Sequence, residues 1–294
     1  TWAWDKCGEC QETQGNQVWA RVRGGNTELT GDKRLDMETD NFVAQLGYDF
    51  SVNYNPENGS RRHTGFMLGY GQSKTDFFDQ YRAENAQIVA DKFTGEGTTD
   101  AASVGVYSTY YDKNGSYLDL VGQVSYLQNE YKARDGRNAD QDGWGAGLSA
   151  EVGRPYKLGN SHWLIEPQAQ LSYQFVSLED FNDGSANVDQ DDQHSLRGRI
   201  GTRLAYNAPT ADYRTKTFYA VANVLSDFIE PTDVKIGRDK LNEDYSRTWG
   251  EVGLGMQLPI ATSAYVYADA RYQQELSGED RNGYTGTIGL KHSW

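Results

Sequence analysis

The sequence contains little cysteine, the residue that forms disulfides and binds zinc, and little proline. Only 2 of its 294 residues are cysteines, Cys7 and Cys10, and only 6 are prolines. A structural zinc site usually needs four ligands, and no second cysteine pair exists to complete one. A thioredoxin-like motif needs a strand–helix–strand context, which the sequence does not indicate. The two cysteines are therefore predicted to form a small structural disulfide in an oxidising compartment, and no metal or cofactor is expected.

Long apolar runs and excess positive charge are also missing. A transmembrane helix needs roughly 18–20 consecutive apolar residues, so a helical membrane protein is not expected. The formal net charge is -14, which argues against nucleic acid as a partner, because phosphate binding needs a basic surface. Acidic residues concentrate at 179–183 and 189–192. We interpret these stretches as solvated loops, with cation-bridged contact to lipopolysaccharide as the alternative.

Aromatic residues and glycine, in contrast, are abundant. The chain has 20 tyrosines, 7 tryptophans and 32 glycines, although only 37% of it is hydrophobic. Disordered chains are poor in aromatic residues. Transmembrane barrels combine these properties, because only alternate strand residues touch lipid, the lumen is polar, and tyrosine and tryptophan form girdles at both interfaces.

Apolar and polar residues alternate along most of the chain, which predicts β-strands. Many of the alternating segments exceed the roughly five or six residues of a soluble strand and match the roughly nine to eleven of a membrane-spanning one. We therefore predict an all-β fold, a twelve-stranded antiparallel transmembrane β-barrel of the outer-membrane type. The expected strand cores are 18–23, 42–53, 63–74, 102–112, 116–130, 144–156, 163–176, 196–206, 216–228, 247–258, 264–274 and 283–294.

The segment 163–176 shows the pattern best. Its apolar face includes Leu171, and its other face carries Glu166 and several glutamines. Lipid outside the barrel and water inside it would explain the two faces. By the same parity, five aromatic residues are expected at the lipid or interface surface: Tyr126, Trp144, Trp163, Tyr173 and Tyr272.

Short and long connections alternate between the expected strands. Long connections are expected at 26–40, 75–100, 178–193 and 230–246. In outer-membrane barrels the short turns face the periplasm and the long loops face the outside. Both ends of the barrel are therefore predicted on the periplasmic side.

The last eight residues, 287–294, form an alternating segment that ends on an aromatic residue. This end resembles the signal that the outer-membrane assembly machinery reads in bacterial barrels. The residues that would carry the signal are Gly289, His292 and Trp294. His292 stands where a hydrophobic residue is usual.

Several strand motifs resemble those of one family. They are the W-x-R…G pattern at 18–24, Gln45–Asp49 with its Gly-Tyr pair, Val104–Tyr107, Ala150–Gly153, and Ile165–Leu171. In their order and spacing, residues 17–294 resemble the translocator domain of bacterial autotransporters, the proteins of type V secretion. Residues 1–17 are interpreted as the remnant of a linker or passenger junction, and 18–294 as the barrel domain.

The resemblance implies a function and partners. The implied protein is a monomeric barrel in the outer membrane of a Gram-negative bacterium. It would anchor an N-terminal passenger, such as a virulence adhesin, and take part in moving it to the cell surface. Its expected partners are the passenger, the assembly machinery, lipid and lipopolysaccharide. In this family a helical linker threads the pore, but 1–17 shows little helical periodicity.

Strand parity directs many charges into the lumen, where charges must satisfy one another. The predicted network contains Arg21, Arg23, Asp49, Arg197, Arg199, Arg203, Asp269 and Arg271, together with Asp119, Glu151 and Glu166. The last three match inward acidic positions of the family branch that cuts its own passenger. Close carboxylates raise one another's pKa and can activate water or an asparagine. We expect Glu151 and Glu166 to be close to direct cross-strand neighbours, with Asp119 one strand away.

Two other functions stay open. The first is an outer-membrane hydrolase, a protease or a phospholipase, for which His194 near Asp191 and Asp192 is the candidate. No Gly-x-Ser-x-Gly motif supports it. The second is a soluble carbohydrate-binding β-protein. The favoured interpretation is a transport module rather than a turnover enzyme.

Overall fold

Twelve long antiparallel strands form the wall of the molecule within the part of the chain that the structure describes. The structure is a computed structural model that describes residues 16–182, 187–209, 215–229, 234–236, 239–241, 247–276 and 281–294. The predicted Cys7–Cys10 disulfide and most of the predicted linker remnant lie outside these residues. Within the same ranges, no helix is long and apolar enough to cross a membrane.

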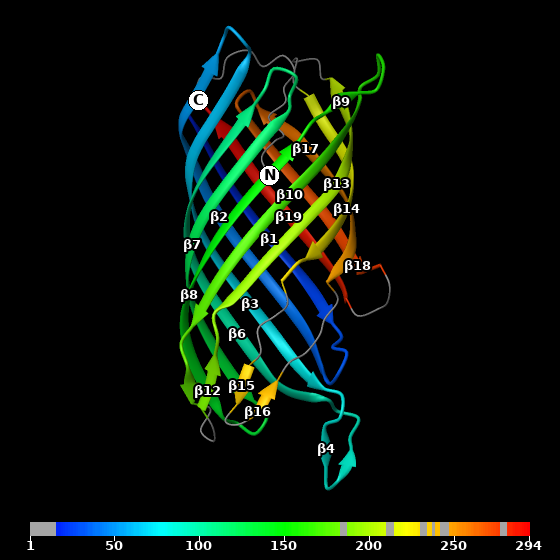
Figure 1. Cartoon of the computed structure of the whole chain (residues 1–294). Coiled ribbons are helices and arrows are strands. Elements are labelled where there is room, and N and C mark those ends of the chain that lie inside the picture. The colour runs from blue at the N-terminus through cyan, green and yellow to red at the C-terminus, as the bar shows by residue number, and fades with distance from the viewer. Residues whose placement is uncertain are drawn as a thin grey trace.

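The wall strands pair with their sequence neighbours, and the last pairs with the first (Figure 1). Register runs from Gln17 opposite Ser293 to Leu29 opposite Arg281, so the sheet closes into a barrel. All twelve predicted strands are confirmed. They are β1 (Gln17–Leu29), β2 (Leu35–Asn55), β3 (Ser60–Asp79), β6 (Phe93–Tyr111), β7 (Tyr117–Ala133), β8 (Asn138–Gly153), β10 (Trp163–Leu178), β13 (Gln193–Pro209), β14 (Thr215–Asp227), β17 (Thr248–Ala261), β18 (Ala264–Glu275) and β19 (Arg281–Ser293).

The described chain also contains short strands besides the twelve that form the wall. β9 (Tyr156–Lys157) pairs with β10, and β4 (Ala83–Glu84) and β5 (Gln87–Ile88) form a projecting hairpin. A four-stranded sheet joins two loops through β11 (Phe181–Asn182), β12 (Asn187–Gln190), β15 (Val234–Ile236) and β16 (Asp239–Leu241). This sheet and the β4–β5 hairpin lie at the end opposite the C-terminus (Figure 1).

Two of the predicted long loops are shorter than expected. The ladder between β1 and β2 continues to Leu29 opposite Met37, so only residues 30–34 connect the two strands. Likewise, β3 runs to Asp79 and β6 starts at Phe93. Beyond the membrane core both strand faces meet water, so apolar alternation fades although backbone pairing continues. The sequence pattern therefore marks the membrane core of these strands and not their ends.

The two faces of β10 confirm the predicted parity. Leu171 on the outer face is 50% exposed, whereas Glu166 on the inner face is 1% exposed. Tyr126, Trp144, Trp163 and Tyr272 are exposed on the outer surface, as expected. Tyr173 is half-buried, because its hydroxyl lies 2.6 Å from His194 Nδ1 on the neighbouring strand.

Inward aromatic rings lie across glycines of the adjacent strand. At each such glycine, a Cβ would stand well inside the van der Waals distance of the ring. Glycine is therefore required there so that a large ring can lie against the wall. Within the described strands the register pairs are Trp19–Gly47, Tyr107–Gly65, Tyr117–Gly153, Tyr219–Gly255 and Tyr267–Gly289.

Candidate functional site in the barrel lumen

Asp119 and Glu151 face each other across the β7–β8 ladder. Both are buried. Thr109 on β6 donates a hydrogen bond from its Oγ1 to Asp119 Oδ1 at 2.6 Å. The three strands thus place a hydroxyl and two carboxylates side by side on the inner wall.

Glu151 has a donor on each carboxylate oxygen. The Tyr117 hydroxyl donates to Oε1 at 2.6 Å, and Arg199 Nη2 donates to Oε2 at 2.8 Å. Glu151 is 1% exposed, so these two donors replace the water that the carboxylate loses on burial. Both oxygens of this buried carboxylate are therefore hydrogen-bonded to side chains of neighbouring strands.

Glu166 is held by a separate pair of donors, because Arg203 Nη2 lies 3.1 Å from Oε2 and Gln168 Nε2 lies 2.9 Å from Oε1. The expectation that Glu151 and Glu166 are close to direct cross-strand neighbours is wrong. Glu151 pairs with Gln170 on β10, four positions from Glu166, which corresponds to about 13 Å along the strand. Tyr117 interacts electrostatically with both glutamates and connects the two pairs.

Arg199 makes hydrogen bonds to several side chains of the inner wall. Besides Glu151, it donates to Gln170 Oε1 at 3.0 Å, to Gln168 Oε1 at 3.2 Å and to Asn223 Oδ1 at 3.1 Å. The partners belong to β8, β10 and β14, so this one guanidinium crosslinks strands on both sides of β13. These contacts join one positive charge to a carboxylate and three amides, as buried charges require.

Other predicted network members pair locally. Arg271 lies 2.9 Å from Glu251 and 3.6 Å from Asp269, while Arg197 donates to Asp227 at 2.6 Å. Arg21 donates to Gln45 at 2.6 Å.

A second buried cluster surrounds Asp49. It accepts a hydrogen bond from the Tyr107 hydroxyl, and its Oδ2 lies 3.0 Å from His63 Nδ1. Trp19 Nε1 donates to the Tyr107 oxygen at 2.8 Å. His63 and Tyr107 were not among the sequence candidates. The alternation in the sequence predicts that both side chains face inward. Their convergence on Asp49, however, depends on the register of three strands.

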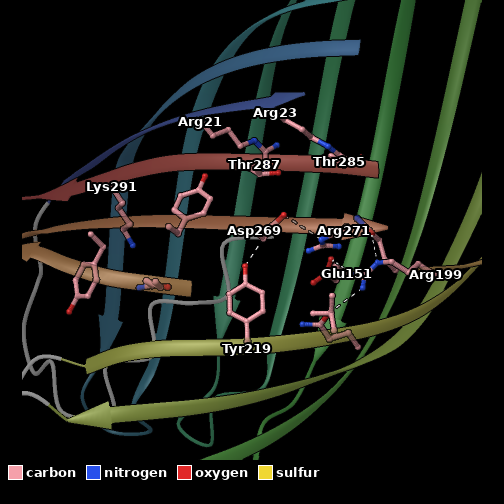
Figure 2. Close-up of a pocket in the computed structure, with 16 residues that line it drawn as sticks. Arg21, Arg23, Glu151, Arg199, Tyr219, Asp269, Arg271, Thr285, Thr287 and Lys291 are labelled. Carbon is pink, nitrogen blue, oxygen red and sulfur yellow. Dashed lines mark hydrogen bonds and ion pairs between the residues drawn. The ribbon is translucent and has the colours of Figure 1, made fainter. Parts of the chain in front are cut away.

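The lumen also contains a cavity of about 270 Å³ (Figure 2). Residues on β1, β18 and β19 line one side of it, and Glu151, Arg199 and Tyr219 line the other. In the described part of the chain no group of three or more His, Cys, Asp or Glu could hold a metal ion. Most of the lining is polar: it consists of arginines, Lys291, tyrosines, threonines, glutamines, Val221 and the two carboxylates of Glu151 and Asp269.

His194 lies on the outer face and not in the lumen. It pairs with Phe175 across the β10–β13 ladder, and the two ring centroids are 5.1 Å apart. Its Nδ1 contacts the Tyr173 hydroxyl, whereas in a Ser-His-Asp triad a carboxylate holds this nitrogen. This position gives no support to the hydrolase alternative.

Comparison with known proteins agrees with the barrel geometry. A family model described as the autotransporter β-domain matches residues 18–271. The adhesin BmaC autotransporter of Brucella suis is 24% identical over 296 residues, which cover 95% of this chain and 8% of that protein. The pertactin autotransporter of Bordetella parapertussis is 27% identical over 289 residues, covering 94% and 28%. The chain thus spans less than a third of either relative.

Solved structures share the fold. The transport unit of the autotransporter AIDA-I from Escherichia coli has a TM-score of 0.78 at 21% identity, covering 98% of this chain and 92% of that one. The β domain of the Bordetella autotransporter BrkA has a TM-score of 0.73 at 22% identity, covering 95% and 100%.

Proposed function

Because the chain belongs to the autotransporter β-domain family, we propose that its barrel carries a passenger linked to its N-terminal end. The barrel is an outer-membrane barrel of a Gram-negative bacterium, and it takes part in translocating that passenger. The observation that carries the proposal is the closed wall, which is apolar outside and lined by charges inside. Residues 1–17 would belong to the junction with the passenger.

The class of passenger is a separate part of the proposal. The similar proteins from Brucella and Bordetella bear the names adhesin and pertactin, which suggests a surface passenger here too. Both proteins are far longer than this chain. An adhesive, virulence-related passenger is the class that these names favour.

Lipid, lipopolysaccharide and the assembly machinery are the proposed membrane partners. Exposed side chains such as Leu148 and Leu254 supply the outer surface that lipid would cover. Gly289, His292 and Trp294 would form the assembly signal. Trp294 is exposed and stacks on Tyr48, with ring centroids 6.2 Å apart. A closed sheet leaves no edge for strand pairing with another copy, which supports a monomer.

A surface-display assay tests the proposed transport role. A folded reporter domain is fused ahead of Thr1 and expressed behind a secretion signal, and protease is added to intact cells. We expect the reporter to be cleaved while the barrel resists digestion. The matched control is the same reporter without the barrel, which should stay protected. A correctly folded outer-membrane barrel with its reporter held in the periplasm would contradict the proposal.

Self-cleavage of the passenger inside the lumen is a second candidate. The pairing of Asp119 with Glu151 supports it, since adjacent carboxylates can share a proton, so that one accepts a proton from water while the other donates to the leaving amide. The Arg199 and Arg203 partners of the two glutamates support a purely structural role instead. Self-cleavage by these carboxylates therefore predicts that removal of one of them slows passenger release.

The full precursor decides between these roles. Asp119→Asn and Glu166→Gln are each expected to slow passenger release, and Glu57→Gln in the exposed β2–β3 turn is the matched control. Release is followed by gel analysis of membranes and medium. A wild-type rate in both lumen variants would leave the three acids with the structural role alone.

A further inference from the structure

Two arginines flank two threonines on the wall where the barrel closes. Thr287 on β19 pairs with Arg23 on β1 and with Asp269 on β18. One step along the inner face, Thr285 pairs with Arg271. The two threonine side chains therefore lie between the guanidinium groups of Arg23 and Arg271, and all four line the lumen cavity (Figure 2).

Arg23 has no hydrogen-bond acceptor among the described residues, unlike Arg199 and Arg271. Arg199 donates to four side chains and Arg271 contacts two carboxylates. Among the described residues, none accepts a hydrogen bond from Arg23, and its electrostatic neighbours include Arg271 and Arg197 as well as two acids. A guanidinium has five N–H donors in a planar fork. Arg23 thus directs an unused fork into a cavity beside other positive charges.

The cavity carries surplus positive charge. Its two lining carboxylates are already matched, Glu151 by Arg199 and Asp269 by Arg271. The lining carries five basic side chains against these two carboxylates, and the basic ones are Arg21, Arg23, Arg199, Arg271 and Lys291. This local excess stands in a chain whose formal net charge is -14.

We propose that this cavity is a binding site for an oxyanion, a phosphate or carboxylate group. The Arg23 fork is its principal ligand, and Arg271 with the Thr285 and Thr287 hydroxyls completes the cradle. A planar guanidinium matches two oxygens of such a group with parallel charge-assisted hydrogen bonds. The volume of about 270 Å³ equals roughly nine waters at about 30 Å³ each, enough for a hydrated phosphate or a glutamate side chain.

The oxyanion could come from a free solute or from an acidic peptide segment inside the lumen. The chemistry of recognition is the same, so both sources are tested. The site is independent of passenger transport, because it is measured on the folded chain without a passenger.

The test titrates inorganic phosphate into the full chain, folded in detergent, by calorimetry with chloride holding the ionic strength constant. We expect saturable binding that weakens at least about tenfold in Arg23→Gln, which loses one bidentate charge-assisted contact. Arg137→Gln is the matched control, because its guanidinium pairs with Asp135 at 2.6 Å in an exposed turn. Heat-modifiable gel migration confirms folding of each variant, and Arg23→Lys, which keeps charge without the fork, should bind with intermediate strength.

A triglutamate peptide is the second probe. Tighter binding of the peptide than of phosphate assigns the site to acidic segments, and binding of phosphate alone assigns it to a solute. Absence of binding by both probes overturns the proposal, as does equal binding by wild type and Arg23→Gln. Failure of the reporter-display assay with intact phosphate binding would count against the transport role only.

Discussion

The glycine beneath Tyr117 offers a sharp test of how the lumen is built. In Gly153→Ala the new Cβ would stand 2.5 Å from Cε1 and 2.6 Å from Cζ of the Tyr117 ring. Carbon atoms rest at about 3.5–4.0 Å, so the ring must retreat by roughly 1 Å. Overpacking of this kind costs about 1–3 kcal/mol.

Movement of the Tyr117 ring would also lengthen or break a buried hydrogen bond. The Tyr117 hydroxyl donates to Glu151 at 2.6 Å, and Glu151 is 1% exposed. A hydrogen bond to a charged group contributes about 1.5–3 kcal/mol. We therefore expect Gly153→Ala to lower the free energy of unfolding by about 1–3 kcal/mol if the ring tilts and keeps this bond, and by more if the bond breaks.

Gly147→Ala is the matched control. It lies on the same strand and the same inner face, but its Cβ would meet nothing closer than Gln123 Cγ at 3.6 Å. The expected change is within about 0.5 kcal/mol. Urea unfolding in phospholipid vesicles, followed by tryptophan fluorescence, measures both variants.

A double-mutant cycle with Tyr117→Ala completes the test. Without the ring, Gly153→Ala should cost little, so the two changes should couple by about 1–3 kcal/mol. The reasoning is refuted if Gly153→Ala unfolds like Gly147→Ala, or if its cost is unchanged in the Tyr117→Ala background.

Three further predictions concern the outer face, assembly and a loop. Leu171→Arg should cost about 2–4 kcal/mol in vesicles because it places a charge in lipid, and a cost near zero would contradict the parity of β10. Trp294→Ser should lower the amount of heat-modifiable barrel in outer-membrane fractions without lowering synthesis, and normal insertion would exclude a signal role. In the loop 80–92, the Arg134 guanidinium holds the pKa of Asp91 below its ordinary value by a hydrogen bond, so this stabilisation is present at neutral pH and lost only as pH falls through that lowered pKa. Arg134→Gln should raise the Asp91 midpoint in an NMR titration toward about 3.9, and an unchanged midpoint would rule out the pairing.

The number of strands and the direction of their side chains could be predicted, because each strand shows its own alternating pattern. Alternation decides the two faces, as Leu171 and Glu166 illustrate, and lipid makes the outer pattern strict. The outer ends of β1 and β2 could not be predicted, because their pairing beyond Asn26 is held by backbone bonds that any polar sequence can make.

The candidate site was only partly predictable for a related reason. The inward direction of Asp119, Glu151 and Glu166 followed from parity, but their partners depend on the register of different strand pairs. Glu166 lies opposite Arg203, and Glu151 reaches Arg199 on a strand with which β8 does not pair. Such contacts require the stagger and curvature of the closed barrel, which no single strand encodes.

Whether lipid covers one face of each strand and water the other is tested most directly along β10. Cys7 and Cys10 are replaced by serine, and one cysteine at a time is introduced at 169–174 to carry a spin label. The barrel is folded in outer-membrane lipid, and collision of the label with oxygen is compared with its collision with a water-soluble nickel chelate. Oxygen should dominate at Ala169, Leu171 and Tyr173, and the chelate at Gln170, Ser172 and Gln174. Accessibility that does not alternate, or that gives the lipid signal to the second set, would contradict a membrane-spanning barrel with a polar lumen.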